Sequence, residues 1–144
     1  MTQNPRVITV DGTAGSGKTT LGSRLAAELD LPLVDTGLFY RAVTVAAVRA
    51  GIDESQKNEL ARLARDTKIE INTEPEPREW QVKVDGVDAG PLLRDPRNAV
   101  LLGIVSQTPE VRAALLDRQR QAAGRGAACP GDRHRSIRRQ GWRP

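Results

Sequence analysis

Gly12, Gly17, Lys18 and Thr19 have the types and spacing of a phosphate-binding loop, G-x-x-x-x-G-K-[ST]. An apolar stretch, residues 7–10, precedes the loop, and a helical pattern follows it. Backbone N–H groups of a glycine-rich turn at a helix N-terminus bind anions, and glycine permits the positive φ angles that such a turn requires. The sequence therefore predicts that a polyphosphate binds between a buried parallel strand and a helix.

The residue types of this loop suggest how it would bind ATP. Lys18 is the predicted catalytic residue, because its ammonium group can reach the β- and γ-phosphates. The Thr19 hydroxyl is the predicted ligand of the cofactor, Mg²⁺. The alternative is a glycine-rich turn with a solvated lysine. The predicted ATP-binding residues are Gly12, Thr13, Ala14, Gly15, Ser16, Gly17, Lys18, Thr19 and Thr20.

The composition limits the class of protein. The 144 residues suffice for one domain, and 38% are hydrophobic but only 3% aromatic, so Val, Leu, Ile and Ala must form the core. A single cysteine excludes a disulfide framework. No apolar run reaches the roughly 18 residues of a membrane span, and the N-terminus lacks a secretory pattern. We therefore expect a cytoplasmic protein that binds no membrane. A monomer is the expected assembly.

Positive charge is concentrated at the C-terminal end of the chain. The formal net charge is +4, and residues 125–144 carry six arginines and one aspartate, so residues 1–124 sum to −1. The body of the chain thus gives no indication that it binds a nucleic acid polymer. An arginine-rich arm that binds nucleic acid or an acidic partner remains an alternative for the tail.

A second polar cluster follows residues 31–34, which are predicted to form the next parallel strand of a βαβ unit. The cluster of Asp35, Thr36, Tyr40 and Arg41 stands where this strand ends and a mostly apolar helix begins, which Gly51 is expected to end. Ligands bind at the carboxyl ends of strands in open α/β sheets, so this cluster is a candidate site. The planar guanidinium of Arg41 suits a monophosphate, and a solvated surface arginine is the alternative.

The order of these motifs resembles that of the bacterial cytidylate kinases, a branch of the nucleoside monophosphate kinases. The resemblance rests on the phosphate-binding loop, on Asp35-Thr-Gly-x-x-Tyr-Arg41 and on Pro109-Glu-Val-Arg112. It implies an α/β P-loop fold, in which a parallel sheet has helices on both faces and a small antiparallel β insert. The implied reaction is phosphoryl transfer from ATP to CMP or dCMP.

The resemblance also implies roles for residues outside the loop. Thr36, Arg41 and Arg112 would bind the phosphate of CMP, and Arg94 would support the insert, so these four are the predicted substrate-binding residues. Asp35 would lie just outside the ligand shell of Mg²⁺, although an N-cap of the following helix is an equally good interpretation.

Hydrophobic patterns predict the remaining elements. Residues 54–66 are expected to form a surface helix, and residues 68–72 and 80–85 an antiparallel hairpin in which Trp80 packs. A tight turn and a short strand are expected within residues 84–90. Two further helices are predicted over residues 98–107 and 110–123, with Thr108 as the N-cap of the second. The predicted domains are a P-loop core (1–66), a monophosphate-binding insert (67–93), core helices (94–123) and a disordered basic tail (124–144).

Two departures from the family are visible. Gly103 stands where relatives usually have a serine, so a base or ribose contact would be absent. The resemblance is expected to end near residue 122, because residues 124–144 show neither helical nor strand periodicity where the family continues with a strand and a Gly-Arg-Asp motif. We interpret the tail as a frameshift or truncation product, so that the sheet is incomplete and the chain nearly inactive. Rereading the DNA in its other frames past codon 126 tests this.

Two other functions stay open at this point. Another P-loop small-molecule kinase, of the shikimate or adenylate type, would share the loop but not the second motif. A nucleotide-binding module without catalysis would bind ATP and transfer no phosphate.

Overall fold

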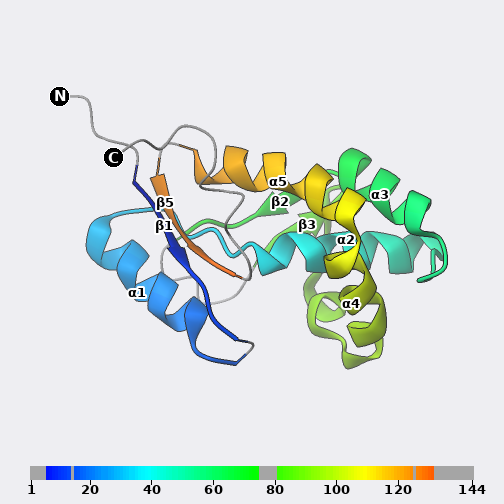
Figure 1. The fold of residues 1–144 in the computed structure, drawn as a ribbon, viewed down its shortest axis with the longest axis horizontal. Coiled ribbons are helices and arrows are strands. Elements are labelled where there is room, and N and C mark those ends of the chain that lie inside the picture. Colours follow the sequence, from blue (N-terminus) through cyan, green and yellow to red (C-terminus); the bar gives the residue numbers. More distant parts are fainter. Residues whose placement is uncertain (1–5, 14, 75–80, 125, 132–144) are drawn as a thin grey trace. The chain divides into compact units, whose positions relative to one another are not determined.

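The structure, a computed structural model, describes residues 6–13, 15–74, 81–124 and 126–131 (Figure 1). Its contacts divide the chain into two units. The first comprises the described residues within 1–37, 73–78 and 118–144, and the second those within 38–72 and 79–117. The domain boundaries that the sequence suggests, after residues 66, 93 and 123, stay predictions. Observed is the mixed α/β architecture that was expected, with a parallel strand pair and flanking helices.

A parallel pair of strands is the centre of the first unit (Figure 1). β1 (Arg6–Val10) pairs with β5 (Gly126–Pro130), and α1 (Lys18–Leu29) packs against β5. Residues 7–10 are half-buried, not buried as predicted, since β5 is the one strand paired with β1 in the described part of the chain.

The prediction that residues 124–144 contain no strand and are disordered is wrong for β5. Ala127, Ala128 and Cys129 have no exposed surface. A strand that is covered on both faces shows a continuous apolar run without alternation, and small residues give that run little β propensity. Periodicity therefore could not identify this strand.

The predicted strand over residues 31–34 is reduced to one parallel bridge, from Leu33 to Ala128. The Ala128 N–H donates to the carbonyl oxygen of Pro32 over 2.9 Å, so the segment runs beside β5 in the expected direction. Pro32 and Pro130 have no N–H group, and each removes a donor from a regular ladder here.

Gly22 of α1 lies against the ring of Pro130. A Cβ atom at position 22 would lie 3.0, 3.1 and 3.2 Å from three ring carbons, and Pro130 is fully buried. We expect Gly22→Ala to lower the free energy of unfolding by about 1–3 kcal/mol, because overpacking outweighs the gain in helix propensity. Denaturant unfolding measures this. Gly103→Ala is the matched control, since its Cβ would meet nothing within 4 Å and should stabilise the protein or leave it unchanged. Equal effects of the two substitutions would contradict the prediction.

The burial of β5 can be tested by chemical labelling of Cys129, the single cysteine of the chain. Burial raises the pKa of its thiol from 9.0 to about 11. The stability that this thiol contributes is therefore complete below its ordinary pKa of 9.0 and is lost as the pH rises from there through about 11. At pH 8 we expect a thiol reagent to modify the folded chain at least ~100-fold more slowly than the chain in concentrated guanidinium. Similar labelling rates would mean that β5 is not buried.

In the second unit, α2 (Gly37–Ala50) packs on an antiparallel sheet. β2 (Ile69–Ile71), β3 (Val82–Val84) and β4 (Val87–Asp88) pair in that order, which confirms the predicted hairpin and short strand. Asp85 and Gly86 have φ angles of 51° and 80°, as a tight hairpin turn requires. Trp80 lies outside the described residues. The apolar cluster between helix and sheet includes Leu38, Ala42, Val45, Ala46, Val82 and Val84.

The other helices follow the prediction with small differences. α3 (Lys57–Asp66) starts later than expected, because the Gln56 N–H donates to the carbonyl of Asp53 and closes a turn there. Two short 3₁₀ helices, η1 (Gly90–Arg94) and η2 (Pro96–Asn98), precede α4 (Ala99–Gln107) and α5 (Pro109–Ala123). Thr108 precedes α5 as expected, but its hydroxyl donates to the carbonyl of Ile104 over 2.8 Å. Its side chain therefore contacts the end of α4. Its backbone is extended and its carbonyl accepts from the Arg112 N–H over 3.0 Å, as expected of the residue at the N-cap position of α5.

Candidate functional site

The loop between β1 and α1 has the backbone of an anion-binding turn. Gly15 and Gly17 have φ angles of 75° and 84°, in the left-handed region that favours glycine. α1 starts at the next residue, Lys18, without a side-chain cap and without an acidic residue in its first turn. The first N–H groups of the helix therefore keep their capacity to bind an anion. Ala14, a predicted ATP-binding residue, lies outside the described residues.

The Lys18 side chain folds back over this loop. Its Nζ donates to the carbonyl oxygens of Gly12 over 2.9 Å and of Thr13 over 2.7 Å. A Cβ atom at position 12 would lie only 2.7 Å from Oγ of Ser16, so the loop closes tightly at this glycine. The ammonium charge is thus held at the loop, where a polyphosphate would be bound.

Asp35 connects the loop helix with the second polar cluster. Its Oδ2 accepts a hydrogen bond from the Thr19 hydroxyl (3.2 Å), and its Oδ1 accepts one from the Gly37 N–H (3.0 Å). The two interpretations of Asp35 are therefore compatible, because one carboxylate contacts Thr19 and caps the start of α2. Hydroxyl and carboxylate oxygens are ligands that Mg²⁺ prefers. Within the described residues no group of three or more His, Cys, Asp or Glu could hold a metal.

Thr36 is buried against the end of β5. Its hydroxyl donates to the carbonyl oxygen of Pro130 over 3.3 Å, and its N–H donates to the same oxygen over 3.2 Å. The sequence did not identify Pro130 as the residue that positions Thr36, since β5 itself was not predicted. The hydroxyl oxygen can still accept a hydrogen bond, so the predicted contact with a substrate stays a prediction.

In the second unit, Arg41 and Arg94 line one cavity of about 230 Å³. The Arg41 Nη1 donates to the carbonyl oxygen of Leu93 over 3.0 Å, which fixes its guanidinium at the cavity wall. The structure therefore brings together two of the predicted substrate-binding residues. The lining consists of Arg41, Thr44, Leu92, Leu93, Arg94, Asp95, Pro96, Asn98, Ala99 and Leu102.

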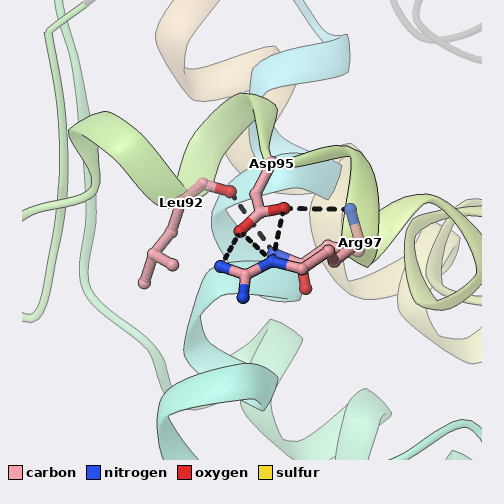
Figure 2. A network of polar contacts seen from close by, with 4 residues as sticks. Leu92, Asp95 and Arg97 are labelled. Atoms are coloured by element: carbon pink, nitrogen blue, oxygen red, sulfur yellow. Dashed lines mark hydrogen bonds and ion pairs between the residues drawn. The ribbon is translucent and has the colours of Figure 1, made fainter.

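Asp95, a residue that sequence reasoning missed, also lines this cavity, and Figure 2 shows its carboxylate paired with Arg97. Its carboxylate accepts hydrogen bonds from the N–H, Nε and Nη2 of Arg97, over 2.9, 3.0 and 2.6 Å. The hydrogen bonds from the Arg97 side chain, and to a smaller extent the one from the Arg97 backbone N–H, lower the pKa of Asp95. The Asp-Pro pair could have indicated it, because an aspartate followed by proline is typical of a helix start.

Arg112 lies elsewhere in the second unit and is held by two groups. Its Nη1 donates to the carbonyl oxygen of Ser106 over 3.0 Å, and its guanidinium carbon lies 5.7 Å from the centre of the Tyr40 ring. Since Arg41 directly follows Tyr40 on α2, Arg112 is attached to the same helix turn as Arg41. A Cβ at Gly103 would meet no atom within 4 Å, so the position that departs from the family borders open space.

Comparisons with known proteins give one consistent result. The family model for cytidylate kinase matches residues 8–131. A cytidylate kinase of Desulfitobacterium hafniense (strain Y51) is 39% identical over 119 residues, which are 83% of this chain and 50% of the relative. One of Pelotomaculum thermopropionicum is 37% identical over 125 residues, 86% of this chain and 55% of the relative. A bifunctional pantoate ligase/cytidylate kinase of Synechococcus elongatus is 35% identical over 123 residues, 83% of this chain and 23% of the relative.

These matches change one expectation about the C-terminal part. The family match continues through β5 to residue 131, so the expected end of the resemblance near residue 122 is wrong. The chain spans about half the length of the first two relatives. The origin of the arginine-rich residues that follow position 131 stays a prediction.

Proposed function

Because the chain belongs to the cytidylate kinase family, we propose that it transfers the γ-phosphoryl group of ATP to CMP or dCMP, giving ADP and CDP or dCDP. The observation that carries this proposal is the geometry of the loop after β1. Left-handed glycines, an uncapped helix start and an ammonium group within 2.9 Å of the loop carbonyls suit a polyphosphate better than any other ligand class.

Phosphoryl transfer requires little covalent chemistry from the protein, which has to align donor and acceptor and to neutralise charge. On the donor side, the amides of residues 12–20 and the Lys18 ammonium would bind the β- and γ-phosphates. Thr19 would hold Mg²⁺, and Asp35 would orient the Thr19 hydroxyl through their 3.2 Å hydrogen bond. When bound, the ion would neutralise negative charge on the phosphate oxygens.

On the acceptor side, we propose that Thr36, Arg41, Arg94 and Arg112 bind CMP or dCMP. Arg41 and Arg94 face one cavity, and a guanidinium can bind two oxygens of a phosphate at once. Arg41 donates through Nη1 to the carbonyl of Leu93, and Arg112 donates through Nη1 to the carbonyl of Ser106. In each arginine the N–H groups of Nε and Nη2 can therefore donate to a ligand.

The proposal is tested by binding first and by transfer second. Calorimetric titration of the full chain with ATP plus Mg²⁺, and separately with CMP, should give saturable binding in both cases. Transfer of labelled γ-phosphate from ATP should then occur to CMP and dCMP and exceed transfer to AMP or shikimate. Saturable ATP binding without transfer to any acceptor would favour the non-catalytic module. Transfer to a different acceptor would favour another P-loop kinase.

Assembly and partners are part of the same proposal. We propose a monomer whose partners are ATP and CMP or dCMP, with no nucleic acid polymer and no membrane. Within the described residues, no single helix is both long and apolar enough to cross a bilayer. Sedimentation at several concentrations tests the monomer, and concentration-dependent mass would contradict it.

A further inference from the structure

We infer that Tyr40 is a positioning residue whose ring holds the guanidinium of Arg112 at the helix turn that carries Arg41. The inference rests on the proposed function, since it concerns how the acceptor nucleotide is bound. It starts from the tyrosine of the second motif, to which neither the phosphate chemistry nor the apolar core assigns a role.

The contact between ring and cation is direct. The guanidinium carbon of Arg112 lies 5.7 Å from the centre of the Tyr40 ring, within the distance of about 6 Å at which a ring attracts a cation. Both side chains are half-buried, so water screens this attraction less than at an exposed site. The contact also joins α2 to α5, two helices that are far apart in the sequence.

A second contact fixes the remaining freedom of the guanidinium. The Arg112 Nη1 donates to the carbonyl oxygen of Ser106, in the last turn of α4, where carbonyls lack a partner within the helix. The carbonyl holds one edge of the group while the ring holds the group as a whole against α2. The other edge, Nε and Nη2, keeps the pair of donors that matches two oxygens of a ligand.

Tyr40 and Arg41 are adjacent on α2, and each makes a contact with a different part of the second unit. Consecutive side chains on a helix diverge by about 100°, so Tyr40 and Arg41 cannot contact the same group equally. Arg41 instead donates to the carbonyl of Leu93, while Tyr40 attracts Arg112. Two arginine side chains are thus anchored at one turn of α2, each by its own contact, and the guanidinium of each can bind oxygens of an anion.

Substitutions of Tyr40 test the inference through CMP binding. Tyr40→Leu removes the ring and should weaken CMP binding to the full chain by about tenfold, with ATP binding unchanged. Tyr40→Phe keeps the ring and should bind CMP within about twofold of the parent. In the background of Arg112→Gln, which lacks the positive charge, Tyr40→Leu should add no more than about twofold. A full tenfold effect in that background, or a Phe variant as weak as the Leu variant, would overturn the inference.

A second measurement does not depend on the folding of the Leu variant or on CMP. Tyr40 is the one tyrosine of the chain, so selective ¹³C labelling of tyrosine gives the ring signals of a single residue. Arg112→Lys should shift these signals, whereas Arg62→Lys on α3 should not; unchanged signals would overturn the contact. If the parent chain binds no CMP, the proposed function fails, but the labelling result still decides whether Tyr40 holds Arg112.

Discussion

Lys18→Ala is expected to weaken ATP binding and to lower phosphoryl transfer to CMP by about 100-fold or more. The Lys18 ammonium lies 2.7 and 2.9 Å from two carbonyl oxygens of the loop. This loop is the proposed binding site of the β- and γ-phosphates. Its charge stabilises the bound triphosphate and the charge that develops on the transferred group, and removal of one such preorganised donor typically costs 10²–10³ in rate. Calorimetry with ATP and labelled phosphate transfer measure the two effects.

Lys57→Ala is the matched control for this prediction. Lys57 is an exposed lysine at the start of α3, in the second unit. Its substitution removes the same charge and should leave ATP binding within about twofold of the parent. The assignment of the loop as the donor site would be wrong if Lys18→Ala bound ATP as tightly as the parent.

Arg41→Ala is expected to weaken CMP binding by about 100-fold and to leave ATP binding unchanged. The guanidinium lines the 230 Å³ cavity with Arg94, and it is held there by the carbonyl of Leu93. Loss of one partner from a close charge pair costs about 2–5 kcal/mol, which corresponds to a factor of at least 30 in affinity. Arg41→Lys should recover part of the loss, because an ammonium keeps the charge but not the planar pair of donors.

Arg62→Ala gives the control for the loss of an arginine. Arg62 is exposed on α3 and pairs with Glu59 at 2.6 Å, so its removal should change CMP affinity and stability little. Thermal unfolding of both variants separates a binding effect from a folding effect. Weakened ATP binding in a folded Arg41→Ala variant would show that Arg41 does not act on the acceptor alone.

Local patterns were sufficient wherever the physical cause lies within a few residues. The loop glycines, the helix stop at Gly51 and the hairpin turn at Asp85 and Gly86 each depend on backbone conformations that the residue types themselves favour. The amphipathic and apolar runs likewise predicted most helices and the antiparallel hairpin, because side-chain periodicity directly reflects which face is buried. The donor loop and Arg41 could be named from the sequence for the same reason.

Contacts between distant parts of the chain were decided only by the tertiary structure. β5 is a strand because β1 and the Leu33 segment pair with it and α1 covers it, and its own alanines carry no signal for this. The bond from Thr36 to Pro130, the cavity that Arg41 shares with Arg94, and the ring of Tyr40 beside Arg112 likewise join residues that are far apart in the sequence. The sequence by itself determined which groups can bind phosphate, since that is chemistry of residue type and local turn. Packing decided which neighbours hold those groups in place. Strand pairing and burial depend on segments that are far apart in the sequence, and such contacts produce no periodic pattern within either segment.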